Sequence, residues 1–272
     1  MSGRRIAQTR TALAVGGLER LLKAGVVVFM LAPALLVIVL SFSNEHTLAF
    51  PPHRWGTRQY HDLFASGYWL GSVGKSFLVS VPAVLLAAAV GVPAVLALER
   101  SRIRGKSALR ALGVAPLVLP GVAYAVALYT FYVQVHLVGH VWGVILADAM
   151  LALPFVILIV GAGLRRIPAD LELVAMSLGA TRTRATWGIT LRLLAPSIVA
   201  AMVLGFVTTF DEAVLVNFVG GGQVITLPKA IYDSLRNGIE PLIAAIASLL
   251  MAFTGVLMVV ANHLRRDSLE QA

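Results

Sequence analysis

Long runs of uncharged, apolar residues are the feature that most constrains how this chain folds. A helix needs about 20 such residues to cross the roughly 30 Å hydrocarbon core of a bilayer. Six predominantly apolar runs of about this length or longer can be drawn, at 24–42, 72–98, 111–133, 141–163, 193–219 and 241–263, and their charged residues are Lys75, Asp148, Asp211 and Glu212. Charged residues make up only 13% of the 272 residues, too few to keep so apolar a chain dissolved as a soluble domain. We therefore predict an all-α polytopic membrane protein with six transmembrane helices.

The distribution of Lys and Arg predicts how the six helices are oriented. Cytoplasmic loops of membrane proteins carry an excess of positive charge. If the N-terminus is cytoplasmic, all but five of the 22 Lys and Arg residues fall on the cytoplasmic side. The exceptions are Arg54, Arg58, Lys75, Lys229 and Arg236. The pattern predicts a basic cytoplasmic N-terminus at 1–23, an extracytoplasmic loop at 43–71 and a cytoplasmic tail at 264–272, so that both termini lie inside.

Composition and motifs exclude several classes of function. The formal net charge of +9 would suit nucleic-acid binding, but the basic residues lie at the ends of apolar runs, as topology signals do. No cysteine is present, so thiolate chemistry is excluded. His136 and His140 have i, i+4 spacing but no third metal ligand. The SVGKS at 72–76 has Trp69 where a phosphate-binding loop needs glycine. We predict no metal site, no cofactor in this chain and no enzyme active site.

About 30 residues separate the fourth and fifth apolar runs, far more than a helical hairpin needs. Within 164–192, the stretch IPADLELVAMSLGA predicts a short helix. Pro168 suits its first turn, Asp170 and Glu172 suit its positive N-terminal end, and Gly179 ends it. Its small residues would let another protein approach the backbone closely. An amphipathic helix lying on lipid headgroups is the alternative that the pattern leaves open.

The same stretch resembles the EAA motif of type I ABC importer permeases, which reads E-A-A, three residues, G, nine residues, I-x-L-P. Gly179 stands at the motif glycine, Ala175 at the second alanine, and Ile189 and Leu191 at the later apolar positions. Three motif positions differ, because Leu173, Val174 and Arg192 replace the glutamate, the first alanine and the proline, and Glu172 lies one position too early.

In that family the segment is a cytoplasmic coupling helix that sits in a groove of a separate ATP-hydrolysing subunit. The resemblance therefore implies a permease fold with this helix between transmembrane helices 4 and 5. It implies ATPase-coupling roles for the following residues: Glu172, Leu173, Val174, Ala175, Leu178, Gly179, Ala180 and Ile189.

Other stretches extend the resemblance over a permease core at 72–263. PLVLPGVAYAVAL, ALPFVILIV, FVTTFDEAVLVNFVGG and TLPKAIYDSLRNGIEPLIAAIASLL are similar to the second permease of spermidine/putrescine-type importers. The resemblance implies import of a small cationic amine across a bacterial inner membrane. It also implies three partners besides the lipid bilayer: an ATPase dimer that binds ATP and Mg²⁺, a second and related permease, and an extracytoplasmic substrate-binding protein.

Acidic residues within the apolar runs are the candidates for a substrate pathway. An acid at the centre of a transmembrane helix costs roughly 2.5–3.5 kcal/mol on insertion scales, so each one needs an explanation. Asp148 and Asp211 fall at similar depths below the outer surface, and Glu212 follows Asp211 directly. With Tyr129 they would form a shallow site for a cationic amine, and Tyr124, Phe131, Tyr132 and Phe210 are further candidates for cation–π contacts. The alternative is that hydrogen bonds to neighbouring Thr or Asn side chains make these acids helix anchors.

A second class of function stays open at this point. A self-contained secondary transporter or channel would use the same acids to bind protons or cations. The segment at 164–192 would then have no role, and six helices without repeat symmetry are unusual for such transporters.

Overall fold

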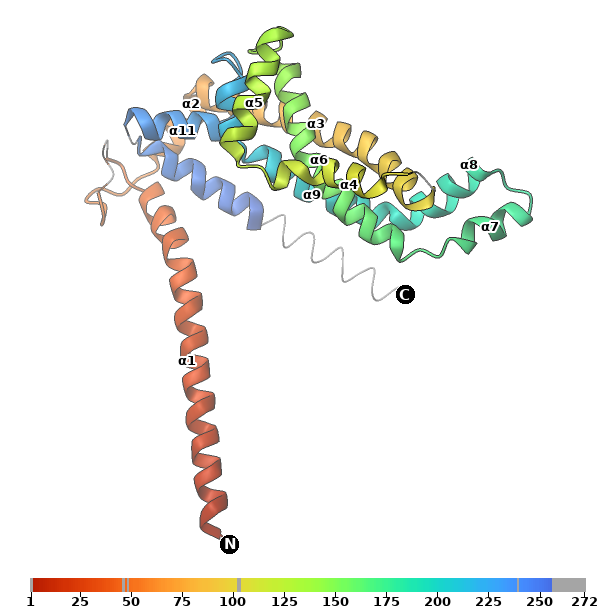
Figure 1. The fold of residues 1–272 in the computed structure, drawn as a ribbon. Helices are drawn as coiled ribbons and strands as arrows, with labels where there is room; N and C mark the ends of the chain where they lie inside the picture. The colour runs from red at the N-terminus through yellow and green to blue at the C-terminus, as the bar shows by residue number, and fades with distance from the viewer. Residues whose placement is uncertain (1, 46, 48, 102–103, 239, 256–272) are drawn as a thin grey trace. The chain divides into compact units, whose positions relative to one another are not determined.

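The computed structural model describes residues 2–45, 47, 49–101, 104–238 and 240–255 (Figure 1). Across these residues the chain is helical, and the only β-type contact is an isolated bridge between Ser43 and Trp55. The chain divides into two compact units. One comprises the described residues up to Gly67 and from Ser234 onward, and the other runs from Tyr68 to Asp233.

The unit that holds the N-terminus is built from three helices. They are α1 (Ser2–Ser41), α2 (Arg58–Ala65) and an apolar helix over Leu242–Gly255. The Tyr60 hydroxyl joins all three, because it is hydrogen-bonded to Ser41 Oγ at 2.7 Å and donates to Ser248 Oγ at 3.2 Å. These bonds hold the C-terminal end of α1 against α2.

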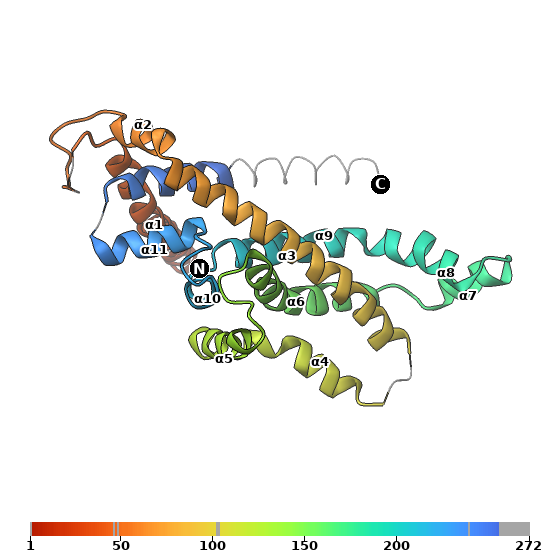
Figure 2. The same ribbon diagram turned by 90° about the horizontal axis from the view of Figure 1, so that it is seen from above.

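The second unit contains the remaining helices in one continuous succession. They are α3 (Gly67–Arg100), α4 (Lys106–Val114), the 3₁₀ turn η1 (Ala115–Leu117), α5 (Gly121–Gln134), α6 (Val141–Arg165), α7 (Asp170–Ser177), α8 (Arg182–Ala185), the π-helical turn η2 (Thr186–Thr190), α9 (Leu191–Phe210), α10 (Val214–Val219) and α11 (Leu227–Asn237). The exceptions are the first residue of α3 and the last four residues of α11, which belong to the first unit. Helix α6 packs against α9, α4 and α10, and α5 packs against α10. Figure 2 shows α6 lying between α3 and α5, with α7 and α8 beyond the ends of α6 and α9.

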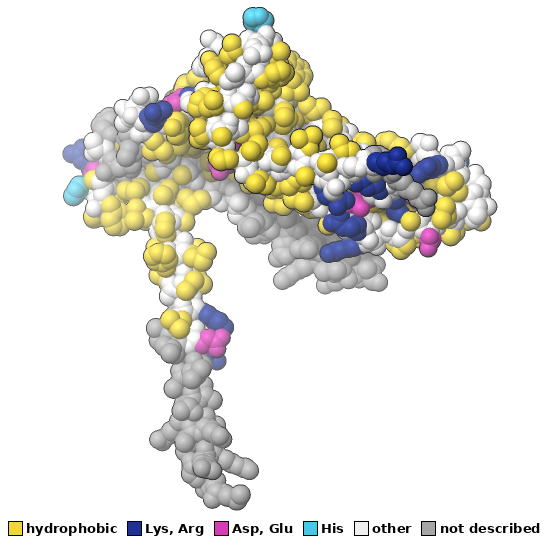
Figure 3. All heavy atoms as spheres, in the orientation of Figure 1, with side chains coloured by type: hydrophobic (Ala, Val, Ile, Leu, Met, Phe, Trp, Pro, Cys, Tyr) yellow, Lys and Arg dark blue, Asp and Glu magenta, His cyan; other side chains and the backbone are white. Residues whose placement is uncertain are grey.

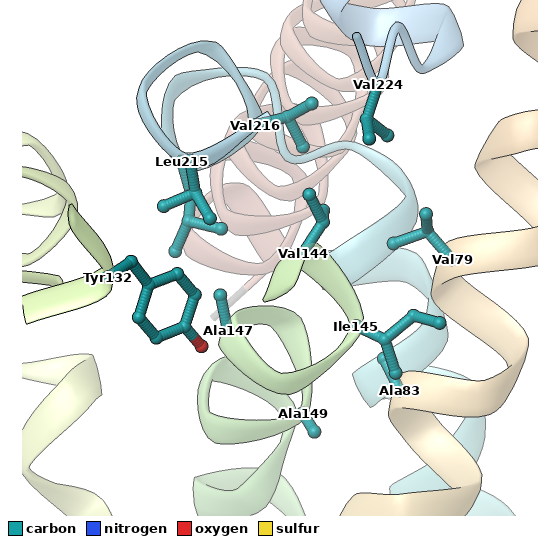
Figure 4. Close-up of a cluster of buried hydrophobic side chains, with 11 residues drawn as sticks. Val79, Ala83, Tyr132, Val144, Ile145, Ala147, Ala149, Leu215, Val216 and Val224 are labelled. Atoms are coloured by element: carbon teal, nitrogen blue, oxygen red, sulfur yellow. The ribbon is translucent and has the colours of Figure 1, made fainter. Parts of the chain in front are cut away.

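Two clusters of buried apolar side chains hold this unit together. One surrounds the first half of α6 and joins it to α3, α5 and α10, with Val144, Tyr132 and Leu215 among its members (Figure 4). The other surrounds the second half of α6 and joins it to α3 and α9, with Val160 and Leu194 fully buried. Helix α6 is therefore the central helix of this unit.

Within the described residues, four helices are individually long and apolar enough to cross a membrane: Leu22–Ser41, Gly67–Arg100, Val141–Arg165 and Arg182–Phe210. Lys106–Leu117 and Gly121–Gln134 pass the same test only as a pair, and they are bent by 104°. Leu242–Gly255 is shorter, and the end of the predicted run 241–263 lies outside the described residues.

Two predicted helices differ from what the structure shows. The run 111–133 is not one straight helix, because Pro120 has no N–H and disfavours helical geometry at the residue before it, so α5 begins anew at Gly121. The run 193–219 is not continuous either. Helix α9 ends at Phe210 and α10 begins at Val214, which places Asp211 and Glu212 in a break rather than inside a helix.

Candidate functional site

Helix α7 and the turn that ends it lie at the centre of the candidate coupling segment, residues 164–192. Gly179 has a φ of 93°, which an amino acid with a side chain adopts only with strain. Its N–H donates to the Met176 carbonyl at 3.0 Å, and the Ala180 N–H donates to the Ala175 carbonyl at 3.0 Å. This pair of bonds is a Schellman motif, which satisfies the last carbonyls of the helix. Gly179 therefore ends α7, as its sequence position predicts.

Large apolar side chains of α7 face away from the rest of the chain. Leu173 is 61% exposed, Val174 57% and Leu178 84%. Ala175 and Ala180 are half-buried, and a methyl group added at Gly179 would meet no atom within 4 Å. The segment thus combines exposed apolar side chains with open space beside its glycine, an arrangement that suits a second protein surface and also the lipid headgroups of the alternative.

Glu172 turns toward the chain instead of toward this exposed side. Its carboxylate accepts a hydrogen bond from the hydroxyl of Thr190, which is fully buried in the π-helical turn η2. Ile189 is half-buried in the same turn. The sequence suggested Glu172 and Ile189 as coupling residues but offered no sign of Thr190, because the two partners are 18 residues apart and η2 has no recognisable motif.

Basic side chains gather around the same end of the unit, over α4, the ends of α3 and α6, and α8 (Figure 3). Glu99 at the end of α3 is the acid among them. It accepts hydrogen bonds from Arg110 of α4 and from Arg165 Nη1 of α6, the latter at 2.8 Å. Arg100 Nη2 also donates to the Ile167 carbonyl at 3.3 Å. Helices α3, α4 and α6 are thus joined where the coupling segment begins.

The other candidate residues lie around the break between α9 and α10. Asp211 is exposed at the C-terminal end of α9. Glu212 is half-buried, and its Oε1 accepts a hydrogen bond from the Leu215 N–H at 2.7 Å. The Glu212 carboxylate therefore satisfies a first-turn amide of α10, which explains why a helix restarts here. Asp211 makes no comparable side-chain contact among the described residues.

Asp148 is the most unusual of the predicted acids. It lies on α6 with 0% of its surface exposed, and neither carboxylate oxygen has a hydrogen-bond partner among the described residues. The charge of Glu212 is close enough to act on it. The anchoring alternative predicts hydrogen bonds to neighbouring side chains, and the Asp148 carboxylate makes none among the described residues.

Of the aromatic candidates, Tyr124 and Tyr132 lie beside these acids, whereas Tyr129 does not. Tyr129 is on the exposed side of α5. Tyr124 and Tyr132 lie on the opposite side, where both interact electrostatically with Asp148, and the Tyr124 hydroxyl donates to the Ala147 carbonyl at 3.4 Å. Figure 4 shows the Tyr132 ring beside Ala147. The i, i+4, i+8 series from Tyr124 to Tyr132 is the signal that would have identified this side of α5.

No group of three or more metal-binding side chains occurs in the part of the chain that the structure describes. His136 has a φ of 56° in the turn before α6, so it does not share a helix with His140. The pattern at 72–76 lies inside α3, where Ser76 Oγ accepts a hydrogen bond from the Leu227 N–H at 2.8 Å.

Comparison with known proteins gives one matching family. Residues 76–268 match the model of the binding-protein-dependent transport system inner membrane component. The putrescine transport system permease protein PotI of Escherichia coli K12 is 30% identical over 246 residues, covering 87% of this chain and 86% of PotI. PotC, the spermidine/putrescine transport system permease protein of the same strain, is 25% identical and covers 91% of this chain and 95% of PotC. The molybdenum transport system permease protein ModB of Mycobacterium bovis is 32% identical over 68% of this chain and 75% of ModB.

Two solved structures have a similar fold. A chain of a bacterial ABC transporter involved in the import of the acidic polysaccharide alginate matches with a TM-score of 0.69 and 15% identity, covering 94% of this chain and 97% of that one. A chain of the inward-facing MetNI methionine ABC transporter matches with a TM-score of 0.58 and 19% identity, covering 72% and 93%. These likenesses confirm the predicted all-α fold of an importer permease.

Proposed function

The chain belongs to the family of binding-protein-dependent transport system inner membrane components and is a permease subunit of an ABC importer, and from this premise we propose that a separate ATPase drives it to import a small cationic amine. The observation that carries the ATPase part is the exposed apolar side of α7, ended by the Gly179 turn. An ATPase dimer that binds ATP and Mg²⁺ would dock there. The coupling residues would be those predicted from Glu172 to Ala180, together with Ile189.

The acids support the choice of substrate. Asp211 is exposed at the break between α9 and α10, Glu212 is beside it, and Asp148 is buried without a partner among the described residues. An ammonium group would compensate the negative charges that the protein leaves uncompensated here. PotI and PotC bear the names of putrescine and spermidine/putrescine systems, in line with a cationic amine, whereas ModB belongs to a molybdenum system.

Tyr129 lies on the exposed side of α5, so we do not include it among the residues that contact the amine. Tyr124 and Tyr132 are better placed to contact an ammonium group near Asp148, because their rings lie on the side of α5 that faces α6. We assign the amine pathway to the three acids and these two tyrosines.

The assembly would lie in a bacterial cytoplasmic membrane, with both termini and the coupling segment on the cytoplasmic side. A second, related permease would complete the pathway, and an extracytoplasmic binding protein would deliver the amine. Closure of the ATPase dimer would move both coupling helices and open the pathway outward, and release of ADP and phosphate would reset it.

Purification of the tagged chain from its native membrane in a mild detergent tests this proposal, followed by reconstitution into liposomes. We expect an ATPase and a second permease to co-purify, and we expect ATP-dependent uptake of putrescine in the presence of the binding protein. Molybdate is the matched control and should not be taken up. A chain that purifies alone and transports putrescine without ATP would instead be a secondary transporter.

A further inference from the structure

Helix α7 is joined to the helix that leads back into the membrane by one side-chain hydrogen bond, from the Thr190 hydroxyl to the Glu172 carboxylate. We propose that this bond is the link through which displacement of α7 reaches α9, so that Glu172 and Thr190 are positioning residues for energy coupling. The proposal rests on the proposed function, because it assumes that an ATPase docks on α7.

The covalent connections of α7 are poorly suited to this task. It is joined to α6 through residues 166–169 and to α8 through residues 178–181, and neither stretch is α-helical. The other side-chain hydrogen bond of α7 is local, from Ser177 Oγ to the Val174 carbonyl at 2.7 Å. Helix α7 also packs against α8 and η2, but within the described part of the chain the Glu172–Thr190 bond is the one side-chain hydrogen bond from α7 to the helix over 182–210.

The Glu172–Thr190 hydrogen bond is strong enough to persist when α7 is displaced. A hydroxyl that donates to a carboxylate forms a charge-assisted hydrogen bond, roughly twice as strong as a neutral one. Thr190 is fully buried and Glu172 is half-buried, so water competes little for either atom. The bond is therefore able to hold α7 and Thr190 together when α7 is pushed.

The turn that carries Thr190 is itself unusual. The Leu191 N–H donates to the Thr186 carbonyl, five residues back, so η2 is one π-helical turn within the otherwise continuous helix from Arg182 to Phe210. Isolated π turns are costly and occur mostly at functional positions. Here the turn places Thr190 inward, against α7, while Leu191 and Leu194 enter the apolar cluster around α6.

The far end of the same helix explains why this link matters. Helix α9 begins directly after Thr190 and ends at Phe210, next to Asp211 and Glu212. The beginning of the coupling segment is fastened elsewhere, because Arg165 and Arg100 tie the end of α6 to α3. A displacement of α7 relative to this fastened end would therefore act on α9 through Glu172 and Thr190, and α9 leads to the acids.

Two matched pairs of variants test the link. Thr190→Val keeps the shape but removes the donor, whereas Thr190→Ser keeps the hydroxyl. Glu172→Met keeps the length but removes the acceptor, whereas Glu172→Gln keeps an acceptor oxygen. Asp170→Asn, in the same turn of α7, controls for the loss of a charge, and Thr183→Val on the exposed α8 controls for the loss of a hydroxyl.

The readout is putrescine uptake per ATP hydrolysed, in liposomes that contain the complete complex and its binding protein. We expect Thr190→Val and Glu172→Met to lower this ratio about ten-fold while assembly and ATP hydrolysis persist. The double variant should be no worse than either single variant, because both remove one bond. Thr190→Ser should restore the ratio fully, Glu172→Gln should restore most of it, and the two controls should match the wild type.

The possible outcomes separate the link from the function on which it rests. A wild-type complex that couples uptake to ATP, together with Thr190→Val and Glu172→Met complexes that couple equally well, overturns the link alone. The link is also overturned if Thr190→Val and Thr190→Ser lower the ratio equally, or if Thr190→Val lowers assembly and hydrolysis in step with uptake. A wild-type complex that hydrolyses ATP but takes up no putrescine overturns the proposed function, and the link with it.

Discussion

The coupling segment and the acids around the α9–α10 break differ in the kind of group that the chain leaves unsatisfied. In the coupling segment, Leu178 exposes 84% of its surface, and its neighbours Leu173 and Val174 are also exposed. Near the break, Asp148 exposes nothing, yet both of its carboxylate oxygens lack hydrogen-bond partners among the described residues. The coupling segment therefore exposes apolar side chains, whereas the region around the break buries a polar group.

The proposed function assigns a different kind of partner to each region. An exposed apolar side of a short helix is stabilised by another protein surface that removes it from water. A buried carboxylate is stabilised by a proton or a cation, because no water reaches it. Helix α9 connects the two regions, since it starts at the end of the coupling segment and ends at Asp211. The predictions below test whether the two regions differ in this way.

A bulky residue at Gly179 should have the largest effect. Gly179→Trp places a large side chain in the open space beside the turn and also strains a backbone with a φ of 93°. If the ATPase docks here, uptake per ATP should fall about 100-fold.

Gly179→Asn is the control for this prediction, because asparagine tolerates a positive φ and adds little bulk. It should retain most of the coupling. Normal uptake by the Gly179→Trp complex would show that no ATPase surface approaches this turn.

Removal of the Asp148 charge should lower transport without lowering stability. Asp148→Asn eliminates a carboxylate for which the protein provides no partner among the described residues. We expect putrescine uptake to fall about ten-fold. The thermal unfolding midpoint in detergent should stay constant or rise, because burial of an unpaired acid is costly.

Asp233→Asn is a contrasting control on α11. Asp233 receives hydrogen bonds at 2.5 and 2.6 Å from Lys229, which is 8% exposed, so its loss leaves a buried ammonium unpaired. This variant should lower the unfolding midpoint. If Asp148→Asn lowers the midpoint to the same extent, Asp148 is a structural residue.

The sequence could predict the coupling segment because its signals are contiguous. Asp170, Glu172 and Gly179 mark the two ends of α7, and the motif around Gly179 lies within one short stretch. Thr190 could not be predicted, because its role depends on a π turn and on a partner 18 residues away.

The acid region was harder to predict because several helices form it. Asp148, Asp211 and Glu212 were recognisable as acids in apolar runs, but the break after Phe210 was not. At this break the Leu215 amide donates to the Glu212 side chain instead of to a backbone carbonyl. No Pro or Gly in the sequence marks the position of the break. The spacing of Tyr124 and Tyr132 places both on one side of α5, but only the packing shows that this side faces α6.

Neutralisation of the two acids at the break should have a moderate effect. Asp211→Asn combined with Glu212→Gln removes both charges, while the side-chain amide oxygen introduced at position 212 still accepts from the Leu215 N–H, so α10 stays capped. We expect the apparent KM for putrescine uptake to rise about five-fold, because an exposed carboxylate contributes a modest, solvent-screened attraction. The salt dependence of uptake should weaken as well. Unchanged uptake at low ionic strength would leave Glu212 as a cap of α10 and would leave both residues without a role in transport.

The smallest effect is expected for Glu99, which belongs to neither region but joins α3, α4 and α6 where the coupling segment begins. Its carboxylate accepts from Arg110 and Arg165, so Glu99→Gln weakens the junction of α3, α4 and α6. Both arginines are more than 40% exposed, so solvent screens the pairs and the loss should be about 1 kcal/mol, visible as a small drop in the unfolding midpoint. Uptake per ATP should change less than two-fold, since the link to α9 through Thr190 is untouched. A loss of coupling as large as that of Thr190→Val would mean that force passes through α6 as well, and the two ends of the coupling segment would then have the same role.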